Sequence, residues 1–169
     1  KLHRSLRHLI NLNKTLLLLS RIENNQFPDT ADIDLAALLK DSLALNSEIY
    51  SHKSIRWSVE GEEHLVCSMN DQMASVLVGN LIKNAFVHSQ KDSDIAVNVV
   101  SDGFSVSNPG SSPLDNGKLF HRFYQPSGRR EGSTGLGLAL AFSVCERSGM
   151  QLRYDFEENR HIFSVILKK

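Results

Sequence analysis

The sequence predicts an α+β fold, a two-layer sandwich with antiparallel strands in one layer and helices in the other, preceded by a separate helical segment. Three features of the chain support this fold class. Short segments rich in β-branched and aromatic residues alternate in polarity, as half-buried strands do. Longer segments between them carry apolar residues at helical spacing. The dipeptide Asp102-Gly103 joins two strand-like segments, 95–100 and 104–106, and such a dipeptide is a strong signal for an antiparallel hairpin.

The first 26 residues or so, ending near Pro28, carry the heptad spacing of a helix that packs against another helix. Ile10 and Leu17 widen its apolar face. The helix could pack on its own domain, but we favour a helix of a dimeric bundle, because it precedes the domain rather than lying inside it. We therefore divide the chain into a helical segment, 1–27, and a domain, 28–169. The heptad positions are Leu2, Leu6, Leu9, Asn13, Leu16, Ser20 and Glu23.

The domain is predicted to alternate between helices and strands. Asp34 can cap a helix that continues to Ile49, because its carboxylate accepts hydrogen bonds from free backbone N–H groups. The most regular helical spacing lies between Asp71 and His88. Residues 109–134 have little steady period and are rich in glycine and proline, which predicts a long functional loop. The other predicted elements are strands at 55–59, 64–67, 95–100, 104–106, 151–156 and 162–167 and a helix at 135–148.

The composition argues against several classes of protein. Lys and Arg number 19, as do Asp and Glu, so the chain lacks the positive balance expected of a nucleic-acid binder. Cys67 and Cys145 have no metal-binding spacing, which disfavours a zinc site or disulfide framework and favours a reducing cytoplasm. No apolar run approaches the roughly 18 residues of a membrane span. We expect a cytoplasmic segment without nucleic-acid or membrane contact, and part of a longer protein because Lys1 already lies in a helical pattern.

Three polar residues of the most periodic helix, Asn80, Asn84 and His88, are spaced by four and therefore lie in one stripe beside the apolar face. An amide oxygen is a hard ligand suited to Mg²⁺, and a carboxylate at the same place would repel a triphosphate. Equally, the two asparagines could cap neighbouring backbone or face water. The stripe is a candidate metal site, with both readings open.

A glycine-rich segment, 132–138, ends the long loop and opens the next helix. Glycines at this place let backbone N–H groups approach phosphates at the positive end of the helix dipole. A flexible hinge is the alternative. The segment is neither a dinucleotide fingerprint, since no strand leads directly into it, nor a phosphate-binding loop of the Walker type, since Leu138 stands where that motif has lysine.

Two further segments lie between the stripe and the glycines. Asn108-Pro109-Gly110 follows a strand, and a polar side chain at a strand end can bind the edge of a base. Leu119 to Tyr124 is an aromatic cluster that can anchor a loop over a ligand or simply attach the loop to the core. Four further histidines are isolated in the sequence and are expected to be surface or structural residues: His52, His64, His121 and His161.

Together these segments resemble the ATP-binding catalytic domain of sensor histidine kinases of two-component systems. Asn80-Leu81-Ile82-Lys83-Asn84-Ala85 with His88 resembles the N box, Leu119 to Tyr124 the F box and Gly132 to Leu138 the G2 box, while 108–110 takes the place of the G1 box and 18–23 is similar to the end of the second dimerisation helix. The order and spacing cover nearly the whole chain. The resemblance implies the Bergerat ATP-binding fold of the histidine kinase and DNA gyrase superfamily.

The resemblance also implies roles for individual residues. Asn80 and Asn84 would be catalytic, with Asn84 coordinating Mg²⁺ and Asn80 on the phosphate side, and residues from about 111 to 134 would form a lid. The γ-phosphoryl group of ATP would pass to a histidine located upstream of Lys1, for relay to the receiver domain of a response regulator. The nucleotide-binding residues implied are Asn80, Asn84, His88, Asn108, Gly110, Phe120, Thr134, Gly135, Leu136 and Gly137.

The implied protein is a homodimer formed through the N-terminal helix, and the domain is the cytoplasmic part of a membrane-anchored sensor. Three departures weigh against full activity: Asn108 replaces the G1 aspartate, Ser112 stands near the place of the second G1 glycine, and Val87 and Gln125 replace basic residues common in the family. The alternatives are a degenerate nucleotide-binding regulatory module, either a pseudokinase or biased towards phosphatase activity, and an ATPase of the same fold. We favour the kinase because Asn84, Gly135 and Gly137 are retained.

Overall fold

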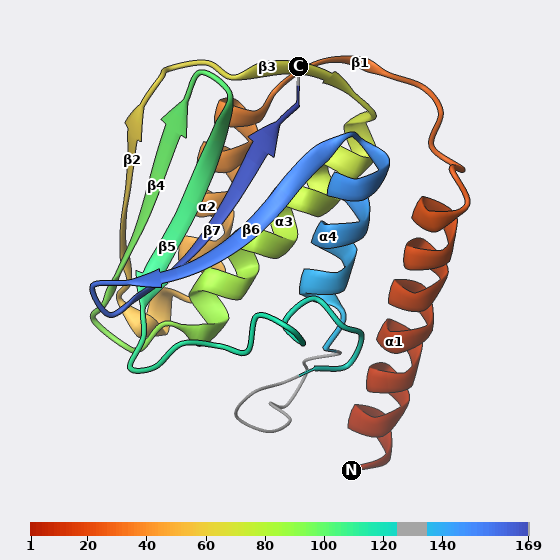
Figure 1. Ribbon diagram of the computed structural model, residues 1–169. Helices are drawn as coiled ribbons and strands as arrows, with labels where there is room; N and C mark the ends of the chain where they lie inside the picture. Colours follow the sequence, from red (N-terminus) through yellow and green to blue (C-terminus); the bar gives the residue numbers. More distant parts are fainter. Residues whose placement is uncertain (125–134, 169) are drawn as a thin grey trace.

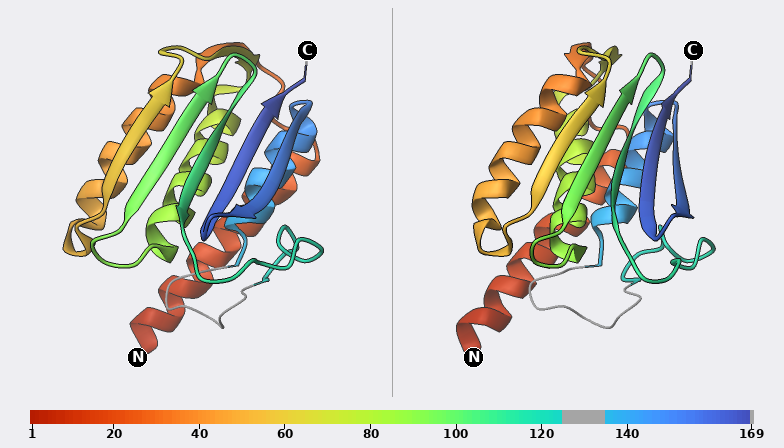
Figure 2. Two further views of the ribbon diagram at one scale, coloured as in Figure 1. Left: turned by 60° about the vertical axis from the view of Figure 1, so that its left-hand side comes forward. Right: turned by 90° about the vertical axis from the view of Figure 1, so that its left-hand side faces the viewer.

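A computed structural model of the chain describes residues 1–124 and 135–168. It consists of one main sheet with helices on one face and a further helix alongside them (Figures 1 and 2). The elements in chain order are α1 (Leu2–Glu23), β1 (Ala31–Asp34), α2 (Leu35–Ile49), the 3₁₀ turn η1 (Ser51–Lys53), β2 (Arg56–Gly61), β3 (Val66–Met69), α3 (Asp71–His88), β4 (Asp94–Val100), β5 (Gly103–Pro109), α4 (Gly137–Arg147), β6 (Met150–Glu157) and β7 (Arg160–Leu167).

The main sheet has the strand order β2-β4-β5-β7-β6, and α2, α3 and α4 cover one of its faces (Figure 2). The pairs β4–β5, β5–β7 and β7–β6 are antiparallel. The predicted hairpin joins β4 to β5, with Val100 opposite Gly103. The predicted α+β two-layer sandwich is therefore confirmed.

Two details of the strand layer differ from the prediction. The strand expected at 64–67 forms at Val66–Met69 and pairs with β1 in a separate two-stranded sheet, and β1, only four residues long, was not predicted. The edge strand β2 pairs with β4 in parallel. Its direction follows from the chain path, since α3 lies between the two strands and a parallel neighbour requires such a long crossover connection. A local sequence pattern does not contain this information.

The core lies between the sheet and its three covering helices. Side chains at helical spacing on α2 and α3 meet alternate residues of β4, β5 and β7, and each fully buried aliphatic side chain contributes about 1.5–3 kcal/mol to folding. Two cysteines remain as free thiols, and burial raises the pKa of Cys145 to about 12. The core residues with the smallest exposure include Leu35, Leu39, Leu43, Leu77, Leu81, Ile82, Phe86, Ile95 and Leu136.

Helix α1 has two unlike halves. Near its end, Leu19 and Ile22 are buried in the domain core, and this part packs against α4. Earlier residues of the heptad line, Leu2, Leu6 and Leu9, are exposed, and the first turns extend past the edge of the sandwich (Figure 1). Within the described residues, no helix is both long and apolar enough to cross a membrane.

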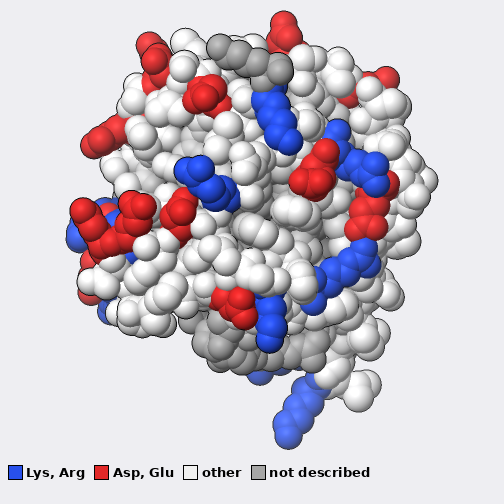
Figure 3. Space-filling model, in the orientation of Figure 1, with Lys and Arg blue, Asp and Glu red and all other residues white. Residues whose placement is uncertain are grey.

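Side-chain caps fix where α2 and α3 begin. Asp34 Oδ1 accepts from Ala36 N at 3.1 Å, as the sequence predicts, and also from Leu65 N at 3.0 Å. Asn70 Oδ1 accepts from Met73 N at 3.1 Å at the start of α3. The bonds from Ala36 N and Met73 N satisfy backbone donors that a helix leaves without intrahelical partners. On the face shown in Figure 3, acidic and basic side chains are interspersed, in keeping with the balanced composition.

Candidate functional site

Three segments far apart in the sequence end at one edge of the sandwich. The C-terminal ends of α3 and β5 and the N-terminal end of α4 all lie there (Figure 1). They carry the asparagine stripe, the Asn108-Pro109-Gly110 turn and the glycines that precede α4. The residues selected from the sequence are therefore brought to the same side of the fold.

The asparagine stripe lies beside the buried face of α3. Leu77, Leu81 and Ala85 point into the core, while Asn80 and Asn84 are half-buried. The Asn80 amide nitrogen donates to the Val76 carbonyl at 2.7 Å, which leaves its Oδ1 available on the side of α4. No hydrogen bond joins the Asn84 side chain to any of the described residues. His88 is exposed on the last turn of α3.

Gly137, the first residue of α4, lies against the asparagine stripe. A Cβ atom built on Gly137 would be 3.1 Å from Asn80 Oδ1, tighter than an ordinary contact. The glycine therefore lets the backbone of α4 come close to the amide oxygen of Asn80. Because the first N–H groups of a helix have no intrahelical acceptor, this junction suits an anion next to the asparagines.

Helix α4 begins two residues later than predicted, because Gly135 has φ +71°, in the left-handed region that a right-handed helix excludes. The Gly135 carbonyl accepts a hydrogen bond from Phe123 N at 2.8 Å. Leu136, 0% exposed, anchors the start of the helix in the core. Thr134, the other residue predicted here, lies outside the described residues.

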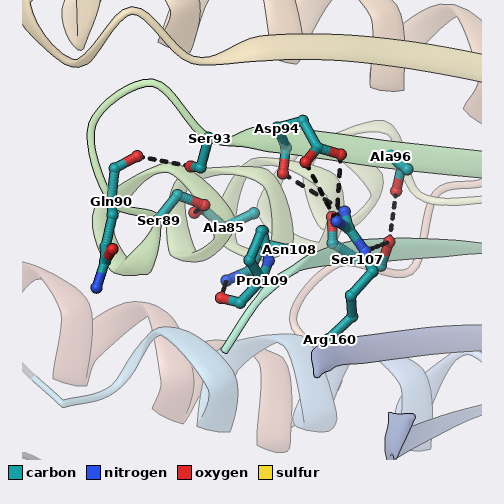
Figure 4. Close-up of polar contacts among 10 residues, drawn as sticks. All are labelled: Ala85, Ser89, Gln90, Ser93, Asp94, Ala96, Ser107, Asn108, Pro109 and Arg160. Carbon is teal, nitrogen blue, oxygen red and sulfur yellow. Dashed lines mark hydrogen bonds and ion pairs between the residues drawn. The ribbon is translucent and has the colours of Figure 1, made fainter. Parts of the chain in front are cut away.

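Asn108 is a buried polar side chain at the end of β5, only 2% exposed. Figure 4 shows it between Ala85 and Ser89 of the α3 end and the cluster formed by Asp94, Ser107 and Arg160. Its amide nitrogen makes a long bond to Pro109 O at 3.3 Å. Within the described part of the chain its Oδ1 accepts no hydrogen bond. An unsatisfied buried acceptor costs about 1–3 kcal/mol, so a donor beyond the described residues, such as one on a bound molecule, would stabilise this oxygen.

Gly110, two residues after Asn108, lies in close contact with His161 of β7. Its N–H donates to Asn159 O at 2.9 Å, and a Cβ atom on Gly110 would lie only 2.1 Å from His161 Nε2. A larger residue would therefore collide with the imidazole ring. His161 is the Cα partner of Asn108 across the β5–β7 pair. Its proximity depends on strand pairing, which is why it appears isolated in the sequence.

The predicted aromatic cluster packs on α4 and β7. The Phe120 ring stacks on Phe142 at 5.4 Å between centroids and meets Phe163 edge-on at 6.5 Å. Arg122 forms an ion pair with Glu23 of α1. Glu23, Phe120, Arg122 and Phe142, but not Phe163, line a cavity of about 770 Å³ between α1 and α4. The described contacts of Phe120 thus support its anchoring role, and contact with a ligand stays a prediction.

Lys53 stabilises the C-terminal end of α3, a contact that the sequence did not suggest. Its Nζ donates to three carbonyl oxygens, those of Phe86 at 2.9 Å and of Val87 and Ser89 at 3.0 Å each. A cation at this end complements the helix dipole. The Tyr50 ring stacks on Phe86 at 6.0 Å, and its burial raises the pKa of the Tyr50 hydroxyl. Both contacts fix the turn that carries His88.

A divalent cation at this edge would depend on few protein ligands. Over residues 1–124 and 135–168, no group of three or more His, Cys, Asp or Glu side chains could hold a metal ion. Mg²⁺ commonly takes one or two protein oxygens, several waters and the phosphates of its ligand. The amide oxygen of Asn84 fits that requirement, since it has no partner in the described chain.

The sequence matches known proteins over most of its length. Residues 69–169 match the family of histidine kinase-, DNA gyrase B- and HSP90-like ATPases. The chain is similar to the swarming motility regulation sensor protein RssA of Serratia marcescens, with 28% identity over 85% of the chain and 32% of RssA. It is equally similar to the sensor protein QseC of Escherichia coli K12, with 28% identity over 91% of the chain and 35% of QseC.

The fold is also found among solved structures. The catalytic domain of the histidine kinase ThkA superposes with a TM-score of 0.74 and 19% identity, covering 83% of this chain and 96% of that one. The chain spans about a third of the length of the curated relatives it matches. The similarity therefore covers only part of these larger proteins.

Proposed function

The chain belongs to the family of histidine kinase-, DNA gyrase B- and HSP90-like ATPases, and we propose that it is the ATP-binding catalytic domain of a two-component sensor histidine kinase. The observation that carries this proposal is the buried Asn108 Oδ1, which has no donor among the described residues, at the same edge as Asn84 and the start of α4. A site for a nucleotide with its metal ion requires three parts: an acceptor for the base, a ligand for the cation and a helix N-terminus for the phosphates. RssA and QseC, both named sensor proteins, support the kinase class.

The nucleotide would lie along this edge with its base and its phosphates at opposite ends. We call Asn108, Gly110, Tyr154 and His161 the base corner, and Asn80, Asn84, Gly135 and Gly137 the phosphate end. In the base corner, Asn108 Oδ1 would accept the amino group of adenine. At the phosphate end, backbone N–H groups of 135–137 would bind phosphate oxygens, with Thr134 beside them. His88 and Phe120 remain candidates for contacts along the nucleotide.

In the proposed reaction the residues of the site mainly hold and orient the nucleotide and its metal ion. Asn84 would coordinate Mg²⁺ through its amide oxygen, and the ion would supply positive charge at the transferred phosphoryl group. Asn80, fixed by its bond to Val76, would orient towards the phosphates. Such positioning can account for several kcal/mol of the barrier to phosphoryl transfer, because little covalent chemistry is asked of the protein. The acceptor would be a histidine outside residues 1–169.

The organisation of the whole protein follows as part of the proposal. Residues 1–27 would be the end of a dimerisation hairpin, and 28–169 the catalytic domain. The exposed heptad residues of α1, among them Leu2, Leu6 and Leu9, would pack against a second copy. The phosphoryl group would then pass from histidine to the receiver domain of a response regulator, in the cytoplasmic part of a membrane-anchored sensor. We propose no nucleic-acid or membrane contact for this segment.

Calorimetric titration of the 169-residue chain with Mg²⁺ and a non-hydrolysable ATP analogue tests the proposal. Wild type should bind, and Asn84→Ala should weaken binding about tenfold or more, because a cation ligand is lost. Asn98→Ala is the matched control, since Asn98 is an exposed asparagine on β4 between the buried Val97 and Val99. If the wild-type chain does not bind the analogue at millimolar concentration, the kinase function is excluded for this domain.

A second measurement separates catalysis from simple binding. The full-length protein, incubated with radiolabelled ATP and Mg²⁺, should acquire an acid-labile phosphohistidine outside residues 1–169. Binding without any label on histidine would favour the regulatory module, for which the neutral Asn108 is the supporting observation. Label on histidine would exclude that alternative.

A further inference from the structure

His161 and Tyr154 form a polar pair in the base corner that no sequence motif indicated. We propose that His161 is a positioning residue for nucleotide binding: its neutral imidazole, oriented by Tyr154, holds the Asn108–Gly110 turn and the start of the following segment in the arrangement that binds the base. This inference rests on the proposed nucleotide site. It assigns to that site two residues from β6 and β7.

The strand register places His161 beside Asn108. The two residues are Cα partners in the antiparallel β5–β7 pair, and directly opposite side chains lie about 4.5–5.5 Å apart at Cβ. Two residues further along, Val106 and Phe163 are partners and both are buried in the core. Side chains alternate between faces along a strand, so Asn108 and His161 share the face that the helices cover. The imidazole thus forms one wall around the buried amide.

The imidazole also supports the Gly110 turn from below. The closest ring atoms, Nε2 and Cδ2, would lie 2.1 and 2.4 Å from a Cβ on Gly110, so the glycine backbone rests directly on the ring. The Gly110 N–H donates to Asn159 O in the β6–β7 turn at 2.9 Å. Glu158 and Asn159 make this two-residue turn with φ 50° and 57°, as in a tight hairpin of the I′ class. The position of the turn after Asn108 is therefore fixed by β7 and its hairpin.

Tyr154 connects His161 to the chain that follows the turn. Its hydroxyl lies 2.7 Å from His161 Nδ1 and accepts the Leu114 N–H at 3.0 Å. With the imidazole proton on Nε2, Nδ1 accepts the Tyr154 proton, and all three groups are satisfied. A protonated imidazole would present N–H at Nδ1 as well, so the Tyr154 proton would lose its acceptor. Protonation should therefore loosen both Tyr154 and Leu114.

The surroundings of His161 favour the neutral form. Burial lowers the pKa of His161 below its ordinary value, and Tyr154, whose own pKa is raised chiefly by burial, is the titratable group that contacts it. Arg160, the residue before His161, points to the opposite face, where it pairs with Asp94 at 3.2 Å and donates to Ser107 O at 3.1 Å (Figure 4). Asp155, beside Tyr154, pairs with Arg153 at 3.1 Å. Arg160 and Asp155 thus both form ion pairs with residues other than His161.

The test compares nucleotide affinity in wild type, Tyr154→Phe and His161→Asn by calorimetry at about pH 8 and about pH 5.5, on either side of ordinary histidine titration. At the higher pH, Tyr154→Phe should weaken binding of the ATP analogue roughly three- to tenfold, the loss expected for one hydrogen bond. His161→Asn keeps an acceptor near Nδ1 and should bind close to wild type. On acidification, wild type should lose at least about threefold more affinity than His161→Asn, which cannot be protonated at this position.

His64→Asn is the matched control, since His64 is exposed and lies away from this corner. Its pH profile should parallel that of wild type, because titration of the nucleotide affects both equally. A profile of His161→Asn that also parallels wild type would overturn the proposal, as would unchanged affinity in Tyr154→Phe. Wild type that fails to bind the analogue at all would instead contradict the proposed function.

NMR titration of the His161 ring in wild type provides a readout that requires no variant. If protonation weakens nucleotide binding, the nucleotide must lower the pKa of His161 by reciprocal linkage. The imidazole signals should therefore titrate at lower pH with saturating analogue than without it. An equal or higher His161 pKa in the complex would overturn the proposal.

Discussion

The phosphate end and the base corner are built in different ways. At the phosphate end, the asparagines share one helix and the glycines adjoin the next, so helical spacing and local backbone freedom define most of the geometry. The base corner assembles Asn108, Tyr154 and His161 from three strands, and its contacts are set by strand register. From the sequence we predict that the first region retains the family's motifs and that the second departs from them at Asn108. A local motif can be read from sequence, whereas a corner made by strand pairing requires the structure.

The largest expected effect comes from Gly110→Ala, which breaks the base corner. The added Cβ would lie 2.1 Å from His161 Nε2, so the imidazole or the turn must move, at a cost of about 1–3 kcal/mol in the free energy of unfolding. Urea denaturation measures this loss. Gly79→Ala is the control, because a Cβ there meets nothing within 4 Å in α3 and should stabilise the helix by about 0.5–1 kcal/mol. Equal stability of the two variants would refute the close approach.

Asn108→Asp should sharpen the contrast by placing a negative charge in the base corner. A carboxylate accepts a stronger hydrogen bond than an amide, so affinity for the ATP analogue should rise up to about tenfold. The empty domain should become less stable, because Asn108 is 2% exposed and a buried unpaired carboxylate is unfavourable. Calorimetry and urea denaturation measure the two effects. Unchanged affinity would show that Asn108 does not accept the amino group of the base.

Gly137→Ala probes the phosphate end with a smaller change. Its Cβ would lie 3.1 Å from Asn80 Oδ1, so Asn80 must shift by a few tenths of an ångström, and affinity for the analogue should fall about two- to fivefold. Alanine is the better helix former, so the free energy of unfolding should not fall. Analogue affinity at or above the wild-type value would separate Gly137 from the site.

How much the sequence could predict differs between these regions. The helix bounds 71–88, the Asp102-Gly103 hairpin and the two-layer fold follow from local spacing and are confirmed. The parallel direction of the β2–β4 pair and the short strand β1, which pairs with β3, were missed. Both depend on how distant segments of the chain meet, which local sequence patterns do not contain. Likewise, Lys53 reaches the end of α3 from 33 residues away or more, a contact that only folding creates. Thr134 lies outside the described residues, so its role stays a prediction.

The smallest expected effect lies away from both regions, at the Asp34–His64 pair. The bond from His64 Nδ1 to Asp34 Oδ2, 2.8 Å long, raises the pKa of His64, and the Leu65 N–H is the main cause of the lowered pKa of Asp34. A raised histidine pKa stabilises the fold at low pH, and the gain is lost as pH rises through the folded-state pKa. The Tm difference between wild type and His64→Gln should therefore shrink from about pH 6 to about pH 8. A Tm difference that grows between about pH 6 and about pH 8 would contradict a stabilising effect of the pair at low pH.

The most direct test of the account is an amide NMR titration of the 169-residue chain with the ATP analogue and Mg²⁺. One nucleotide spanning the edge should shift the signals of Asn84 and Gly137 at the phosphate end and of Asn108 and Gly110 at the base corner, at the same analogue concentration. Asn98, on the uncovered face of the sheet, should not shift. Shifts confined to one end, or absent from both, would contradict the claim that these two regions form a single nucleotide site.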